Sequence, residues 1–232
     1  MNNCTKGGKY ALHSALQNVL AKALNGQNLK AVIVEAHPYA TESTRTDISI
    51  SSAEKPGEIL YYVDTTVTNT QQKRIPKLKK LTDADNIVCC RDLLLNETVV
   101  NNHIFSATAK KLRKFKGCHD SACENGRSPS SIVVPFAVDT LGNFCSVAVI
   151  FLKKLAKIKF EKIPGSTEFR DLTASTWVNT TCRDIQTAII KTCAYNNRSA
   201  LKLAFGEEYD KLYPGSIYSP PSYNENFSSS EG

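Results

Sequence analysis

The chain of 232 residues is long enough for one compact domain with extra helices or a tail, and its 41% hydrophobic content allows a sizeable core. No run of about 18 apolar residues occurs, which excludes a predicted membrane-spanning helix. The opening residues lack a signal-peptide pattern, so we expect an intracellular protein. Eight cysteines without a CxxC pair argue against a disulfide scaffold.

The net charge of +7 is concentrated in the middle of the chain. Residues 73–162 contain 17 Lys and Arg against 8 Asp and Glu, a net charge of +9, whereas the remaining residues together carry −2. Neutralisation of phosphates requires clustered cations, so this distribution favours a nucleic acid as partner. The same distribution also fits a solvated basic surface that binds nothing.

The first half of the chain begins with a predicted helix over residues 9–25, where leucines recur at helical spacing. Short strands are predicted over 31–34, 47–51 and 59–67 from their apolar, alternating or β-branched composition. The turn signal at 54–57, which contains Pro and Gly, joins the second and third strands into a hairpin.

The second half of the chain contains a predicted helix over 104–116 and loop signals over 117–130. A buried strand over 132–138, a helix over 147–158 and one or two helices over 167–204 follow. The core order is therefore α-β-β-β-α-β, which predicts an α/β fold: a mixed central sheet with helices on its faces and additional C-terminal helices.

The domain organisation follows from composition. We expect residues 1–205 to form one domain, because no linker or internal repeat interrupts the alternating elements. Residues 206–232 are predicted to be a disordered tail, because the chain is rich in Pro, Asn and Ser from Tyr213 onward.

Acidic residues near the ends of neighbouring predicted strands are the first candidate site. Asp47 begins the second strand, Asp64 lies in the third, and Glu35 follows the first. Hydrolysis of a phosphodiester at neutral pH uses carboxylates to hold a metal ion, and Mg²⁺ needs only one or two of them. A single Asp near a strand end usually caps a turn, but two acids on adjacent strands of one hairpin favour a metal site.

Basic residues of the helix near position 110 are the second candidate group. Lys110 and Lys114 are four residues apart and share a helix face, with Lys111 and Arg113 beside them. Such cations could offset charge that builds on a phosphate during hydrolysis. The alternative is an ordinary solvated face of the helix.

Four segments in this order carry a resemblance to a known family: Thr46-Asp47-Ile48, Tyr62-Val63-Asp64-Thr65-Thr66, Lys110-Lys111-Leu112-Arg113-Lys114 and Val134-Pro135-Phe136-Ala137-Val138-Asp139. They resemble the restriction-endonuclease-like domains that follow the reverse transcriptase in some non-LTR retrotransposons, which belong to the PD-(D/E)xK nuclease superfamily. Residues 10–16 are similar to the family's opening helix and residues 183–200 to its closing helix.

The resemblance implies a metal-dependent DNA endonuclease of retroelement origin, with Mg²⁺ or Mn²⁺ as cofactor and no organic cofactor. Asp47 and Asp64 match the two metal-binding catalytic acids, and Glu35 matches a helper acid that also binds the metal. The family's helix lysine falls on Lys110, Lys111 or Lys114, of which we favour Lys110 and Lys114 as catalytic. The chain departs from the family pattern at Thr46, where proline is usual, and at Thr66, where a lysine is common.

DNA is the expected partner, and the nucleus the expected location of the protein. The residues predicted to contact the DNA backbone are Lys77, Lys79, Lys80, Lys111 and Arg113. Three other functions remain open: a catalytically inactive DNA-binding relic of such a domain, a junction-resolving or repair nuclease of the same fold, and a protein-interaction module that uses the basic face.

Two further features have competing interpretations. Cys118, His119 and Cys123, with Cys89 and Cys90, have zinc-binding chemistry, but their spacing matches no common finger and also fits a loop with incidental thiols. His13 follows an apolar position of the first helix, and we interpret it as a packed or capping residue.

Overall fold

A computed structural model describes residues 6–26, 28–38, 45–55, 57–69, 103–124 and 132–206. The elements, in chain order, are α1 (Lys6–Leu24), β1 (Leu29–Ala36), β2 (Thr46–Ser52), β3 (Ile59–Thr68), α3 (His103–Glu124), β4 (Ile132–Asp139), α4 (Ser146–Phe160) and α5 (Thr167–Phe205). The described elements follow the predicted order, and the protein belongs to the mixed α/β class.

A four-stranded sheet with the order β1-β2-β3-β4 forms the centre of the protein. β1, β2 and β3 pair in antiparallel fashion, and β4 pairs with β3 in parallel. A parallel pair needs a long crossover connection, and α3 lies in the connection between β3 and β4. The predicted mixed sheet and its hairpin of strands two and three are confirmed.

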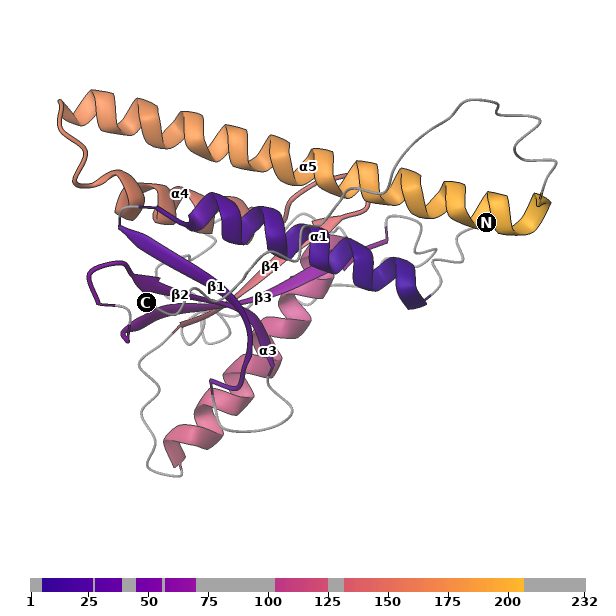
Figure 1. The fold of residues 1–232 in the computed structure, drawn as a ribbon. Helices are drawn as coiled ribbons and strands as arrows, with labels where there is room; N and C mark the ends of the chain where they lie inside the picture. The colour runs from indigo at the N-terminus through magenta and orange to yellow at the C-terminus, as the bar shows by residue number, and fades with distance from the viewer. Residues whose placement is uncertain are drawn as a thin grey trace, which may run out of the picture.

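Helices cover the sheet from two sides (Figure 1). α1, α4 and α5 lie together above the sheet in this view, and α3 runs below it. The core between them includes the T-shaped ring pair of Tyr61 and Phe151, whose centroids are 5.2 Å apart, and the fully buried Leu16, Ile48 and Phe136. Burial of one such side chain contributes about 1.5–3 kcal/mol, so this core accounts for much of the stability.

α3 is longer than the sequence predicted. The helix was expected to end at residue 116, with a loop from residue 117, but it continues to Glu124. A helical glycine such as Gly117 costs only about 1 kcal/mol relative to alanine, so the loop signal is too weak to end a helix by itself. The buried residues Ile104, Leu112 and Phe115 hold the first half of α3 against the sheet.

The C-terminal region, predicted as one or two helices, forms the single helix α5. Ser166 caps its first turn by accepting a hydrogen bond from the backbone N–H of Phe169 at 3.2 Å. Its buried residues, which include Val178, Ile185 and Ile189, recur at helical spacing and face α1 and α4. This continuous buried stripe explains why one helix forms.

Among the helices in the described ranges, none is both long and apolar enough to cross a membrane. The predicted tail lies outside the described residues except for Gly206. Lys77, Lys79 and Lys80, predicted to bind DNA, and Cys89 and Cys90 also lie outside them.

Candidate active site

A cleft of about 1140 Å³ opens between α1, the first three strands and α3. All three predicted acids and both predicted catalytic lysines line it: Glu35, Asp47, Asp64, Lys110 and Lys114. Lys111 and His13 line it as well. The fold therefore gathers side chains from three strands and two helices into one site.

Asp47 lies where β2 separates from β3. The last paired residues of these strands are Ile48 and Val63, and Asp47 comes one residue beyond this pair. Its Oδ2 accepts hydrogen bonds from the backbone N–H of Thr65 at 2.6 Å and from the Thr65 hydroxyl at 2.7 Å. The Asp47 carboxylate thus accepts hydrogen bonds at the point where the two strands separate. These hydrogen bonds fix the position of its Oδ2.

His13 of α1 completes this network. Its Nε2 lies 3.3 Å from Oδ2 of Asp47, 2.9 Å from Oγ1 of Thr65 and 3.2 Å from the Thr65 carbonyl oxygen. Because the Thr65 hydroxyl donates its proton to Asp47, its oxygen can accept from Nε2–H of His13. His13 is therefore a member of the site, a role that the sequence interpretation did not assign to it.

Asp64 occupies the deeper part of the cleft and forms an ion pair with Lys111 of α3. The whole residue is only 8% exposed, so its carboxylate is largely removed from water. Lys111 Nζ also lies 3.4 Å from the carbonyl oxygen of Thr65. The direct lysine partner of Asp64 is therefore Lys111, which the sequence analysis assigned to DNA binding, while Lys110 and Lys114 line the cleft on the same helix.

The two carboxylates differ in protonation behaviour. Burial raises the pKa of Asp47, but the hydrogen bonds from His13 and Thr65 outweigh it, and the pKa of Asp47 falls below its usual value. The pKa of Asp64 is raised by burial and by repulsion from Asp47, against the opposing effect of Lys111. The pKa of His13 is raised, mainly by its hydrogen bond to Asp47.

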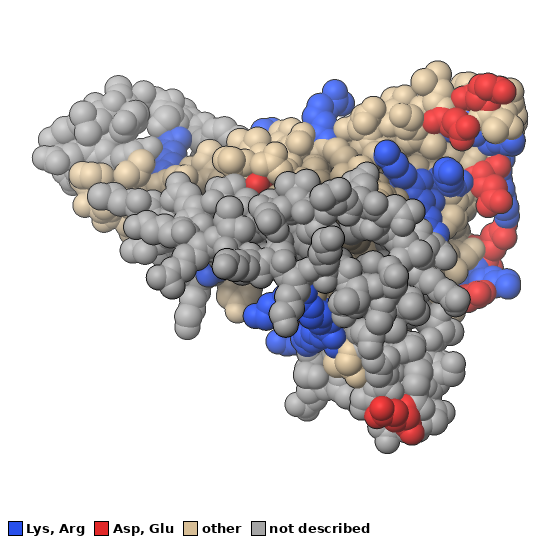
Figure 2. All heavy atoms as spheres, turned by 180° about the vertical axis from the view of Figure 1, so that it is seen from behind, with Lys and Arg blue, Asp and Glu red and all other residues tan. Residues whose placement is uncertain are grey.

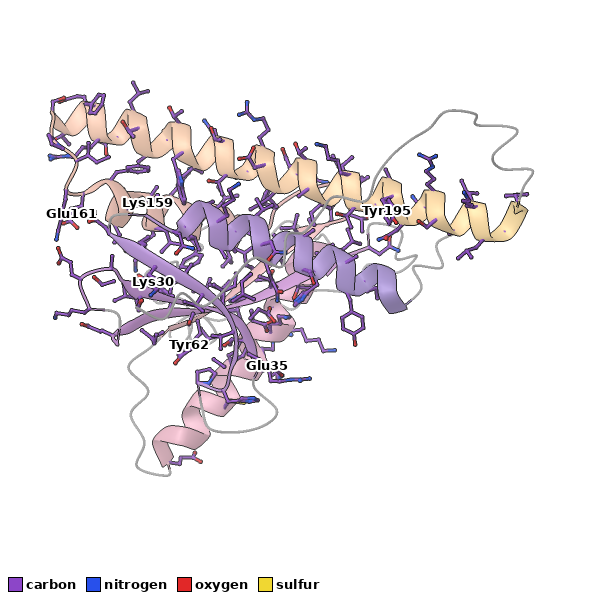
Figure 3. The ribbon with its side chains drawn as sticks, in the orientation of Figure 1. Lys30, Glu35, Tyr62, Lys159, Glu161 and Tyr195 are labelled. Atoms are coloured by element: carbon purple, nitrogen blue, oxygen red, sulfur yellow. The ribbon has the colours of Figure 1, made fainter. Side chains whose placement is uncertain are left out.

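Glu35 lies at the rim of the cleft, where it pairs with Arg45. Figure 3 shows Glu35 at the end of the sheet next to α3, whereas Lys159 and Glu161 lie at the other end. Thr66 also lines the cleft, and its buried hydroxyl oxygen has no hydrogen-bond partner among the described residues.

The donor set fits a hard divalent cation held by few protein ligands. In the described ranges, no group of three or more His, Cys, Asp and Glu side chains is arranged to hold a metal ion. Mg²⁺ is commonly held by one or two carboxylates and keeps several waters. Oδ1 of Asp47 and Oδ2 of Asp64 have no hydrogen-bond partner in the described part of the chain, so each carboxylate has an oxygen to offer.

The surface near the site is basic on the α3 side. Lys110, Arg113 and Lys114 are exposed on this helix. Figure 2 shows a group of Lys and Arg side chains near the middle of its face, apart from the mixed acidic and basic side chains at the edge. Such separation of charge suits a polyanion better than an even mixture would.

The possible zinc site is only partly described. Cys118 is a half-buried free thiol on α3, and its helical position replaces the predicted loop. The side chains of His119 and Cys123 lie outside the described ones. The zinc interpretation therefore stays a prediction.

Helical periodicity contained signals for the positions of both Lys111 and His13. Lys111 is seven residues after Ile104 and three after Thr108, on the buried stripe of α3, whereas Lys110 and Lys114 lie on its exposed face. His13 is three residues before Leu16 and seven before Leu20, at the edge of the buried stripe of α1. A polar residue on a buried stripe needs a partner, and this requirement could have identified both.

Comparison with known proteins gives no assignment, since no family model matches the chain and neither the curated proteins nor the solved structures contain a match.

Proposed function

We propose that the chain is a Mg²⁺- or Mn²⁺-dependent endonuclease that hydrolyses phosphodiester bonds in DNA and has a restriction-endonuclease-like core of retroelement origin. The observation that carries the proposal is the shared cleft, where Asp47 and Asp64 lie beside the α3 lysines. The α-β-β-β-α-β order of the described elements is compatible with such a core.

Asp47 and Asp64 would hold the metal ion through the oxygens that have no other partner. Bound there, the ion would hold the phosphate and lower the pKa of an attacking water. His13 and Thr65 orient the Asp47 carboxylate by binding its other oxygen. Such support of a metal ligand typically contributes about 10- to 100-fold in metal affinity or activity.

The three lysines of α3 that line the cleft fall into two groups by their exposure to solvent. Lys111 is close enough to Asp64 to offset negative charge on a phosphate that would be held by a metal ion on the same carboxylate. Lys110 and Lys114, which the resemblance favours as catalytic, are more exposed and suit contacts with neighbouring phosphates. Glu35 remains a candidate helper acid, although Arg45 neutralises it at the rim.

A plasmid-nicking assay tests the proposal. Wild-type protein with Mg²⁺ or Mn²⁺ is expected to nick supercoiled DNA, and Asp64→Ala is expected to lose more than about 100-fold of this activity, because one metal ligand is gone. Asp171→Ala, which removes an exposed acid from α5, is the matched control and should nick like the wild type. Equal nicking by wild type and Asp64→Ala would contradict the proposal.

A DNA-binding relic is the second candidate, favoured by Thr66 at the position where related nucleases often have lysine. This candidate predicts DNA binding that is unchanged in Asp64→Ala, with no cleavage by either protein. A junction-resolving or repair nuclease would cleave, but would prefer branched DNA to plain duplex in the same assay.

A further inference from the structure

We propose that the cleft binds an unpaired, single-stranded stretch of DNA, with Tyr10 as a stacking platform for a base. The inference rests on the proposed function because it names the form of DNA that the same site accepts.

The side of the cleft formed by α1 and β1 presents one aromatic ring and two aliphatic side chains, besides the polar His13, Gln17 and Glu35. Tyr10 lines the cleft and is 74% exposed, so packing within the chain employs little of its ring. Ile33 and Val34 of β1 line the same cleft and are 39% and 41% exposed. Glu35 beside them is paired with Arg45, which offsets the one acid that the described part of the chain contributes to this side of the cleft.

The opposite side of the cleft is cationic. Lys110 and Lys114 of α3 are exposed and line it. The volume of about 1140 Å³ exceeds the range of about 300–1000 Å³ that is usual for small-molecule pockets. The cleft is therefore large enough for a segment of a polymer, with charge on one side and an aromatic ring on the other.

This two-sided arrangement matches the chemistry of single strands. Non-specific binding of single-stranded DNA combines cations that follow the phosphates with aromatic side chains on which bases stack. In duplex DNA the bases are paired and stacked on each other, so a duplex offers phosphates to Lys110 and Lys114 but no free base face to Tyr10. An unpaired stretch uses both sides of the cleft.

Fluorescence anisotropy with labelled oligonucleotides, without divalent metal, tests the proposal. We expect Tyr10→Ala to bind single-stranded DNA roughly 5- to 100-fold more weakly than the wild type, the range for loss of one stacked base. Its affinity for a fully paired duplex should be unchanged. Tyr10→Phe keeps the ring and should bind both DNAs like the wild type.

Two controls separate stacking from other causes. Phe169→Ala removes an aromatic residue that is 52% exposed near the start of α5, outside the cleft lining, and should leave both affinities unchanged. Lys110→Ala should weaken the binding of both DNAs and reduce the dependence of binding on salt, because it removes a phosphate contact. Thermal unfolding of Tyr10→Ala checks that its fold is retained.

The effect of Tyr10→Ala on the two DNA affinities either supports or overturns the proposal. Equal loss of single-strand and duplex affinity in Tyr10→Ala, or no loss of either, would overturn the proposal. Since no metal is present, selective binding can be found even in a protein that does not cleave. Failure of this proposal therefore differs from failure of the nuclease proposal, which the Asp64→Ala nicking assay measures.

Discussion

Two lysines at opposite ends of the sheet show how differently the protein uses the same side chain. Lys159 donates to the backbone carbonyl oxygens of Leu24 at 3.1 Å and Asn25 at 2.6 Å, where α1 ends. Lys111 instead pairs with a carboxylate that lines an open cleft. Figure 3 marks these ends by Lys159 on one side and Glu35 on the other.

At the Lys159 end, polar groups satisfy each other. Asn28 donates to the carbonyl oxygens of Ile158 and Lys159 at 3.2 and 3.0 Å, which closes the last turn of α4. The Lys159 ammonium group lies 5.8 Å from the centre of the Trp177 ring. Such contacts satisfy the carbonyl groups that a helix end leaves without partners, and their role is structural.

At the cleft end, several polar groups lack such partners in the described part of the chain. Oxygens of Asp47 and Asp64 and the hydroxyl of Thr66 have no hydrogen-bond partner among the described residues. Burial lowers the pKa of Lys159 at one end and raises the pKa of Asp64 at the other. Burial alone therefore does not identify a functional group, because it shifts the pKa of both Lys159 and Asp64. What distinguishes the cleft end is that carboxylate oxygens without hydrogen-bond partners line an open cleft.

Among the variants of Lys111, His13 and Lys159, Lys111→Met is expected to have the largest effect. Lys111→Met should lower plasmid nicking by about 100-fold, as loss of one charge-stabilising donor typically does. Lys114→Met removes a cation of the exposed face and should cost less activity, with a reduced salt dependence of DNA binding. A larger loss of nicking in Lys114→Met than in Lys111→Met would transfer the catalytic role to Lys114.

His13 is expected to have the next largest effect. His13→Ala removes the support of Oδ2 of Asp47 and should lower nicking about 10- to 100-fold. His13→Gln, which retains a donor at similar reach, should recover part of the activity. Nicking rates measured over a series of Mn²⁺ concentrations check this, and unchanged rates in His13→Ala would show that Thr65 alone positions Asp47.

Lys159, at the other end of the sheet, is expected to affect stability and not activity. Lys159→Met should lower the free energy of unfolding by about 1 kcal/mol, because the partly buried carbonyl group of Leu24 and the exposed one of Asn25 lose their donor. Nicking per folded molecule should stay at the wild-type rate. Urea denaturation and the nicking assay, performed on the same preparation, measure both quantities; loss of nicking without loss of stability would contradict the structural role.

The smallest expected effect is a pH dependence of stability at the cleft end. The raised pKa of His13 means that its contribution is fully present below about pH 6.5 and is lost as the pH rises through the folded-state value. The lowered pKa of Asp47 gives a contribution present above about pH 4 and lost as the pH falls. His13→Ala should therefore destabilise the protein more at about pH 5.5 than at about pH 8.5 in urea denaturation.

Local patterns were sufficient for most of the fold. The helical spacing of leucines in α1 and the alternation in β2 and β3 are local properties, and these elements lie close to their predicted positions. The extension of α3 past Gly117 was missed because the cost of a helical glycine is small compared with the packing of a whole helix.

The site was only partly predictable. The predicted hairpin brings Asp47 and Asp64 toward each other, and in the structure they flank the last pair of β2 and β3, Ile48 and Val63. The partners of His13 and Lys111 depend on how α1 and α3 pack against the sheet, which local spacing does not specify. Glu35 could be placed at the strand end, but its partner Arg45 comes from the residue just before β2.

Binding of Mn²⁺ measured by isothermal titration calorimetry tests most directly whether Asp47 and Asp64 share one divalent ion. The account predicts one bound ion in the wild type, with affinity at least about tenfold weaker in Asp47→Ala and in Asp64→Ala separately, and unchanged in Glu54→Ala at the other end of the sheet. Equal Mn²⁺ affinity in the wild type and both cleft variants would contradict it.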